Sequence, residues 1–340
     1  MPDAPVSDTR VPLSILDLAS LKADHTSTDA LNDTIWLAEQ ADEAGFDRFW
    51  VAEHHNTKSV VSTNPPVLVS ALGAHTKRIK VGSGGVMLPN HAPYVVAEQF
   101  AMLEALYPGR IDLGIGRAPG TDQLTAAALR RGTDALSVEE FPHHVLQLLH
   151  WLGDERLDEP MVQRLVATPE PTSFPEVWLL GSSGYSAQLA GMLGVRYCYA
   201  HHFGGMDPVS VFEAYRSRFE PSASLDAPHA MICTSAITAD TEEEADFLAG
   251  PARKMWLSIR TGAREPIVTP EAAAAHELSA TDQIMLAQSP ATKFVGTHDH
   301  VTEQLRALVE GTGVQELMLT ATTFDIATKM ATYRAISDRW

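Results

Sequence analysis

The chain has 340 residues, of which 45% are hydrophobic and 20% are charged, and its formal net charge is −18. Phosphate backbones are bound by clustered Lys and Arg side chains, so this acidic balance argues against a nucleic-acid partner. The longest apolar runs have the length of a strand, so no membrane-spanning segment is expected.

The first ten residues, "MPDAPVSDTR", are polar and contain prolines. They lack the apolar centre of a signal peptide, which predicts a flexible tail over 1–10 and a cytoplasmic protein. The two cysteines, Cys198 and Cys233, stand within apolar runs. Buried free thiols are therefore expected rather than a disulfide.

Strand-like segments alternate with longer amphipathic segments along the chain. Strands are predicted at 11–18, 46–55, 78–88, 110–116, 176–181, 195–202, 229–237 and 315–322. Helices are predicted between them, among others at 27–45, 65–76, 94–106, 135–152 and 185–194. Eight units of a strand followed by a helix predict an α/β fold, a (β/α)₈ TIM barrel with insertions, over a single domain at 11–340.

Two segments interrupt this alternation, at 153–175 and at 250–295. Connections of this length in a compact fold are usually lids or interface elements. The segment 250–295 is therefore predicted to form a lid.

The residues that finish each strand are the candidates for a site, because barrel enzymes act at the carboxyl ends of their strands. The third strand contains "VGSGGVML", with Ser83, Gly84 and Gly85 at its centre. Adjacent glycines in a strand indicate either a bulge that serves barrel packing or a place where a ligand approaches the backbone. The residues alone leave both interpretations open.

Three stretches, "WVAEHHN", "VGSGGVMLPNHAPYVVAEQFAMLEALYPGRIDLGIGRAPG" and "VWLLGSSGYSAQLAGMLG", resemble the flavin-dependent luciferase-like monooxygenases in order and spacing. The resemblance is to the single-chain FMN branch of the bacterial luciferase superfamily and runs from about 11 to 330. It implies a TIM barrel that binds reduced FMN at its strand ends. It also implies a cis peptide bond, not preceding proline, at Gly84–Gly85.

The same resemblance assigns roles to individual residues. It implies catalytic roles for His54 and its neighbours Glu53 and His55. The implied cofactor-binding residues are Ser83, Gly84, Gly85, Arg117, Gly181, Ser182, Ser183 and Gly184. The family often has an acidic residue where Gly181 stands, which is a departure of this chain. The expected substrate pocket contains Leu16, Leu18, Met87, His201, His202 and Phe203.

The implied reaction uses reduced FMN, supplied by a separate NAD(P)H:flavin reductase, and dioxygen. A flavin hydroperoxide would then oxygenate a small, apolar organic substrate. The family forms dimers through the helices after the second and third strands, which implies a homodimer.

Other functions are compatible with the sequence. A dehydrogenase or reductase of the same superfamily would use a deazaflavin coenzyme, and a non-catalytic flavin-binding protein would keep the same barrel. A metal-dependent hydrolase could use His54, His55, His201 and His202. Adjacent histidines on a strand point to opposite faces, however, so each pair offers one inward ligand, and no metal site is expected.

Overall fold

The computed structural model describes residues 10–118, 120–130, 139–170, 172–263, 265–287, 289 and 293–340. The predicted tail at 1–10 lies outside these ranges except for Arg10, which is exposed. None of the described helices has the length and apolar character needed to cross a bilayer.

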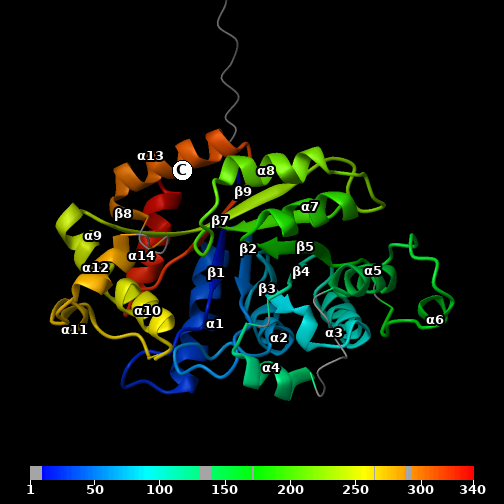
Figure 1. Ribbon diagram of the computed structural model, residues 1–340, viewed down its shortest axis with the longest axis horizontal. Helices are drawn as coiled ribbons and strands as arrows, with labels where there is room; N and C mark the ends of the chain where they lie inside the picture. The colour runs from blue at the N-terminus through cyan, green and yellow to red at the C-terminus, as the bar shows by residue number, and fades with distance from the viewer. Residues whose placement is uncertain are drawn as a thin grey trace, which may run out of the picture.

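The centre of the structure is a closed ring of eight parallel strands surrounded by helices (Figure 1). The ring runs β1 to β6 in order, then β7 and β9, and β9 pairs with β1 again. Its strands are β1 Leu13–Asp17, β2 Arg48–Val51, β3 Lys80–Met87, β4 Ile111–Gly116, β5 Glu176–Gly181, β6 Arg196–Ala200, β7 Ala230–Ala239 and β9 Glu316–Thr320. Each falls within or overlaps a predicted strand, so the predicted (β/α)₈ barrel is confirmed.

Most of the helices lie around the outside of the ring, and one packs against the core inside it. They are α1 Ser27–Glu43, α2 Pro65–His75, α3 Pro93–Leu106, α4 Gln123–Arg130, α5 Phe141–Trp151, α6 Pro160–Gln163, α7 Gly184–Leu193, α8 Pro208–Ser217, α9 Glu242–Leu248, α10 Gly250–Thr261, α11 Pro270–Ala274, α12 Ala280–Ala287, α13 His298–Thr312 and α14 Ile326–Ser337, with a 3₁₀ turn η1 at Leu88–Asn90. The start of α1 is fixed by a capping box, in which the Thr26 side chain and the Asp29 side chain each bind the other's backbone N–H.

The helix predicted at 135–152 is α5, which begins at Phe141 instead. Pro142 stands in its first turn, where a missing backbone N–H costs nothing, so the proline marks a helix start. Residues 135–138 lie outside the described residues.

The insertion at 250–295 contains α10, α11, α12 and a strand β8 at Phe294–Thr297 that was not predicted. The last residues of the long strand β7 extend beyond the ring and pair with β8. The insertion is also joined to the loop after β1, because the Ile267 N–H donates to the Leu21 carbonyl at 2.9 Å and the Ala23 N–H donates to the Ile267 carbonyl at 2.7 Å. A role as a lid stays a prediction, as does the single domain over 11–340.

The hydrophobic core has two parts, which follow from the alternation of side chains along each strand. One part packs between the sheet and the helices. The other lies inside the ring and contains Leu16, Leu18, Trp50, Ala52, Val60, Trp178, Cys198, Met231, Cys233 and Met318, with Met255 of α10 packed against it. This inner cluster forms the base of the cavity described next.

Candidate active site

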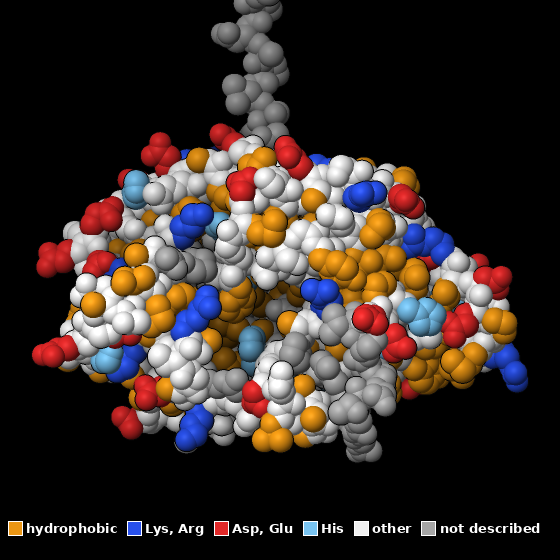
Figure 2. Space-filling model, viewed as in Figure 1, with side chains coloured by type: hydrophobic (Ala, Val, Ile, Leu, Met, Phe, Trp, Pro, Cys, Tyr) orange, Lys and Arg blue, Asp and Glu red, His pale blue; other side chains and the backbone are white. Residues whose placement is uncertain are grey.

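A cavity of about 260 Å³ opens at the carboxyl ends of the barrel strands. Figure 2 shows this face hollowed near its centre, with hydrophobic side chains within the hollow and Lys and Arg side chains at its rim. Of the sequence-predicted residues, Leu16, Leu18, His54, Gly84, Gly85, Met87, Arg117, Gly181, Ser182, Ser183, His202 and Phe203 line it. Glu53, His55, Ser83, Gly184 and His201 are not in the lining.

The β3 wall of the cavity is bare backbone. The Gly84–Gly85 bond is cis, as predicted, and the register between β3 and β4 shifts between Gly84 and Val86. A Cβ on Gly84 would come within 2.7 Å of the Leu16 side chain, and one on Gly85 within 2.6 Å of the Leu180 side chain. A Cβ on Gly85 would also come within 2.7 Å of the Gly114 carbonyl oxygen, which is backbone, so position 85 requires glycine, and the two glycines leave a wall that a flat ring can approach closely. Ser83 is buried, and its hydroxyl donates to the Gly114 carbonyl at 2.9 Å.

The second feature is the N-terminus of α7, which follows β5. Ser183 is the N-cap residue but makes no side-chain capping hydrogen bond, so the first N–H groups of the helix keep their donor capacity. The hydroxyls of Ser182, Ser183 and Ser186 line the same part of the cavity. Gly181 is needed here because a Cβ would overlap the Ser186 hydroxyl.

Arg117, at the end of β4, lies near this helix terminus. Its guanidinium stacks 4.2 Å from the centre of the Tyr185 ring in the first turn of α7. Among the described residues, no carboxylate pairs with it. A helix N-terminus, hydroxyls and an arginine together favour a bound anion such as a phosphate.

Behind the cavity wall, the buried carboxylate of Glu53 collects four donors. Oε1 accepts from His55 Nε2 at 2.8 Å, His91 Nε2 at 2.9 Å and Asn90 Nδ2 at 3.2 Å, and Oε2 accepts from the Met87 N–H at 2.9 Å. Burial raises the pKa of Glu53, but these hydrogen bonds and the nearby histidines outweigh it and leave the pKa below its ordinary value. Glu53 and His55 thus support the loop that carries His54.

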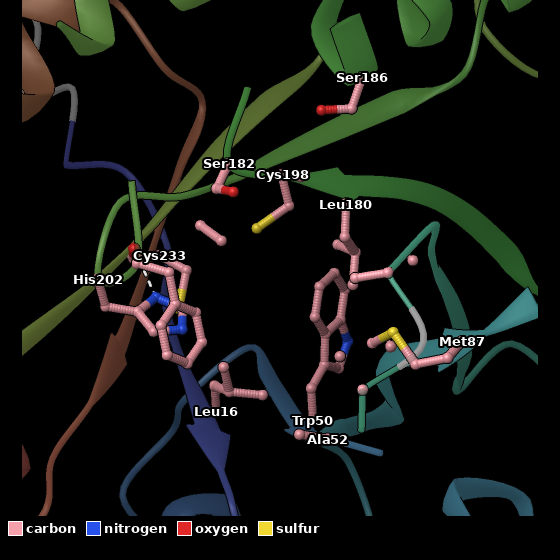
Figure 3. A pocket seen from close by; sticks show the side chains of 18 of the residues that line it. Leu16, Trp50, Ala52, Met87, Leu180, Ser182, Ser186, Cys198, His202 and Cys233 are labelled. Carbon is pink, nitrogen blue, oxygen red and sulfur yellow. Dashed lines mark hydrogen bonds between the residues drawn. The ribbon is translucent and has the colours of Figure 1, made fainter. Parts of the chain in front are cut away.

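The two histidines after β6 have different surroundings. His202 lines the cavity, and its Nδ1 lies 3.1 Å from the Cys233 carbonyl (Figure 3). The ring of His201 binds Thr234 Oγ1 at 3.0 Å and Lys293 Nζ at 3.2 Å. Burial, with Lys293 and His202 nearby, lowers the pKa of His201 to about 4.

Several cavity residues were not predicted as site residues. Trp50 and Ala52 of the second strand, Cys198 and Ala200 of the sixth, Leu180, Cys233 and Met318 all line it. The sequence could have indicated the first four. Alternate residues of a strand face the lumen, so the positions two and four residues before His54 and before His202 point into the same space. Both cysteines are free and buried, as predicted. The described residues contain no group of three or more His, Cys, Asp or Glu side chains that could hold a metal ion.

The chain is similar to known proteins along nearly its whole length. The sequence profile of the family described as luciferase-like monooxygenase matches residues 11–316. The chain is 40% identical to the Bacillus subtilis (strain 168) protein YvbT, with 96% of each chain covered. It is 38% identical to a luciferase-like monooxygenase of Escherichia coli (strain K12), with 98% of each covered. It is 31% identical to the N-acetyl-S-alkylcysteine monooxygenase of Bacillus subtilis (strain 168), over 96% of this chain and 97% of that protein.

Solved structures show the same fold. Apo-MsnO8 superimposes with a TM-score of 0.89 at 31% identity, covering 97% of this chain and 98% of that one. The oxygenating constituent of 3,6-diketocamphane monooxygenase from Pseudomonas putida, solved in complex with FMN, has a TM-score of 0.72 at 21% identity, covering 96% and 97%. An F420-dependent secondary alcohol dehydrogenase has a TM-score of 0.66 at 15% identity, covering 96% and 98%. The last two are likenesses of fold alone.

Proposed function

The chain belongs to the luciferase-like monooxygenase family, and from this premise we propose that it binds reduced FMN and uses dioxygen to oxygenate a small, apolar organic substrate. The observation that carries the proposal is that a bare Gly84–Gly85 wall and a helix N-terminus without a side-chain cap, with Arg117 beside it, line one cavity. A flavin ring joined to a phosphate has both parts. A relative that is 25% identical over 66% of this chain is named a flavin-dependent monooxygenase, which supports a flavin as the cofactor.

The residues of the cavity fit such a cofactor. The backbone of Gly84 and Gly85 would support the ring, and Arg117, Ser182 and Ser183 would hold the phosphate at the start of α7. Reduced FMN supplies the electrons for the reaction with dioxygen. The apolar residues around it, among them Leu16 and Leu18, would exclude water.

His54 is the residue that we propose as proton donor and acceptor. It lines the cavity, and its backbone N–H donates to the Ser62 carbonyl at 3.0 Å, which fixes the loop. The Glu53 and His55 pair would hold this loop in place rather than contact the substrate. An imidazole suits proton transfer near neutral pH. The flavin hydroperoxide implied by the resemblance stays a prediction.

The reductase and the homodimer belong to the same proposal. A trigonelline monooxygenase from Acinetobacter baylyi (strain ATCC 33305 / BD413 / ADP1), 25% identical over 66% of this chain, is named as an oxygenase component, which supports a separate reductase. Val67 on α2 and Val95, Met102 and Leu106 on α3 are exposed apolar residues. They support a dimer through these helices, which sedimentation of the parent and of Met102→Glu would test.

The test of the function is an anaerobic titration with FMN under reducing conditions, followed by mixing with oxygenated buffer. Tighter binding of reduced than of oxidised FMN, with oxygen consumption, is expected. Failure to bind either form would contradict the FMN assignment. Binding of a deazaflavin coenzyme in its place would favour the dehydrogenase, and binding without any turnover would favour a flavin-binding protein.

A further inference from the structure

The cavity has two facing walls. In the ring of eight strands, β3 and β7 lie on opposite sides. Figure 3 shows Trp50, Leu180 and Met87 on the side of β3, and His202 and Cys233 across the space from them. A substrate that meets a ring lying on the β3 wall would therefore contact the wall that carries His202.

The wall opposite β3 is electrically neutral. The described residues that line the cavity include no Asp, Glu or Lys, and their one arginine is Arg117 on β4. Burial raises the pKa of the Cys198 thiol and that of the Cys233 thiol well above the ordinary value, so both are protonated at neutral pH. A charged group pressed against this wall would lose its hydration without a partner.

His202 is a hydrogen-bonding group in this wall, and the tautomer of its ring is fixed by the neighbouring Cys233 carbonyl. The backbone N–H of His202 and Nδ1 of its ring lie 3.2 and 3.1 Å from the Cys233 carbonyl oxygen. A carbonyl oxygen only accepts, so the ring proton is on Nδ1. Burial and the nearby His54 lower the pKa of His202, and the hydrogen bond to the Cys233 carbonyl raises it by less. The resulting pKa is about 4, so the ring is neutral at pH 7.

The other ring nitrogen is left with a lone pair. Within the described part of the chain, Nε2 of His202 has no hydrogen-bond donor, while the ring itself lines the cavity. The adjacent Phe203 ring lies 4.3 Å away, centre to centre, and limits how the imidazole can turn. Nε2 is thus an acceptor held at a fixed position in an apolar wall.

We propose that His202 determines substrate specificity, in that its Nε2 accepts a hydrogen bond from a hydroxyl, thiol or N–H group of a neutral, otherwise apolar substrate. This rests on the proposed function, because it places the cofactor on the β3 wall. The preferred class is a neutral alcohol, thiol or amide. Ethers and ketones have only acceptor oxygens, whose lone pairs would face the lone pair of His202 Nε2 without forming a hydrogen bond. Ionised acids would bury a charge without a partner.

The test compares two probes of the same size, cyclohexanol and cyclohexanone, by calorimetric titration at pH 7. The protein is titrated both without cofactor and with saturating FMN, whose own binding is measured separately. Cyclohexanol is expected to bind about fivefold to tenfold more tightly, since one net hydrogen bond separates the two. Failure of FMN to bind would overturn the proposed function but would leave this ratio measurable, and the two variants described next show whether the ratio depends on His202.

Two variants separate the role of His202 from a structural one. His202→Phe keeps a ring and removes the acceptor, so the ratio of the two affinities is expected to fall to about one. His201→Gln is the matched control, because the His201 ring binds Thr234 and Lys293 instead, and it is expected to keep the ratio of the parent. Equal binding of both probes by the parent, no binding of cyclohexanol, or a preference kept by His202→Phe would overturn the proposal.

A second measurement needs no ligand. Nitrogen-15 NMR of the histidine rings, with His202 assigned by the signal lost in His202→Gln, is expected to show a neutral ring with its proton on Nδ1 between about pH 5.5 and 8. A ring that is protonated at pH 6, or that carries its proton on Nε2, would overturn the proposal even if His202→Phe did not fold.

Discussion

The side chains that point into the barrel differ between its two ends. At the amino end, charged residues that stand at or near the start of their strands form a buried network, in which Arg48 donates to Asp112 Oδ1 at 2.7 Å and to Glu316 Oε2 at 2.7 Å. At the carboxyl end, glycine, aliphatic, aromatic and sulfur-containing residues line most of the lumen, together with serines and histidines, and Arg117 is the one Lys, Arg, Asp or Glu among the described lining residues. The amino end is closed by paired charges, while the carboxyl end is left open with a single unpaired cation among its described lining residues.

The two ends meet at Trp50. Its indole lies in the cavity, and its Nε1 donates to Asp112 Oδ2 at 2.8 Å. The Arg48 guanidinium also lies 5.0 Å from the Trp178 ring beneath the cavity. The charged network therefore contacts both tryptophans at the base of the cavity and fixes the indole of Trp50 by a hydrogen bond. Each of the following variants breaks one side of this division.

The largest effect is expected from Arg48→Met. It removes the cation and leaves Asp112 and Glu316 buried without it, which should lower the free energy of unfolding by about 3–5 kcal/mol in urea titrations. Arg78→Met is the control, since the Arg78 side chain is exposed and its pairing with Asp42 contributes at most about 1 kcal/mol. A loss no larger in Arg48→Met than in Arg78→Met would contradict the role given to the network.

At the open end, Arg117→Met should weaken FMN binding by roughly tenfold to a hundredfold, because a charge-assisted hydrogen bond to the phosphate is lost. Riboflavin has the same ring without the phosphate and serves as the internal control, so its affinity should not change. Fluorescence titration measures both. An equal loss for FMN and riboflavin would mean that Arg117 shapes the cavity and does not bind the phosphate.

A smaller and pH-dependent effect is expected at Glu176, whose carboxylate accepts from Lys80 Nζ at 2.7 Å and lies 3.0 Å from Arg48 Nη1. Burial acts to raise the pKa of Glu176, but Arg48, Lys80 and Arg196 lower it to about 2 from its ordinary 4.5. A carboxylate with a lowered pKa adds stability above pH 4.5 and loses it as the pH falls toward 2.

Glu176→Gln should therefore be less stable than the parent by about 1–2 kcal/mol at pH 7, after allowance for solvent screening, and the difference should close near pH 2. Glu303→Gln, on the exposed side of α13, should change stability by less than about 0.5 kcal/mol at either pH. Urea titrations at several pH values measure this. A difference that persists unchanged at pH 2 would show that Glu176 acts through packing and not through its charge.

Much of the fold could be predicted because the barrel strands are short apolar runs separated by helical patterns. Strand β8 was missed because it has four residues and, among the described strands, pairs only with the end of β7 that extends beyond the ring, which no local sequence pattern indicates. The start of α5 was placed too early because Pro142 was not read as a helix-start signal.

Part of the site could be predicted from the positions of the strands along the sequence. Residues at strand ends, such as His54 and Arg117, can be found from the fold class alone. Cys198, Cys233 and Met318 lie deeper in the lumen and require the register of each strand. His91 binds Glu53 across 38 positions of sequence, and its position depends on the turn after β3. Such contacts depend on tertiary geometry.

The most direct measurement is a crystal structure of the protein with FMN bound. We expect the isoalloxazine ring to lie against the Gly84–Gly85 backbone and the phosphate to lie between Arg117 and the first N–H groups of α7, with His202 facing the ring across the remaining space. A flavin bound elsewhere, or in this cavity with its phosphate away from Arg117 and α7, would contradict the proposed cofactor site.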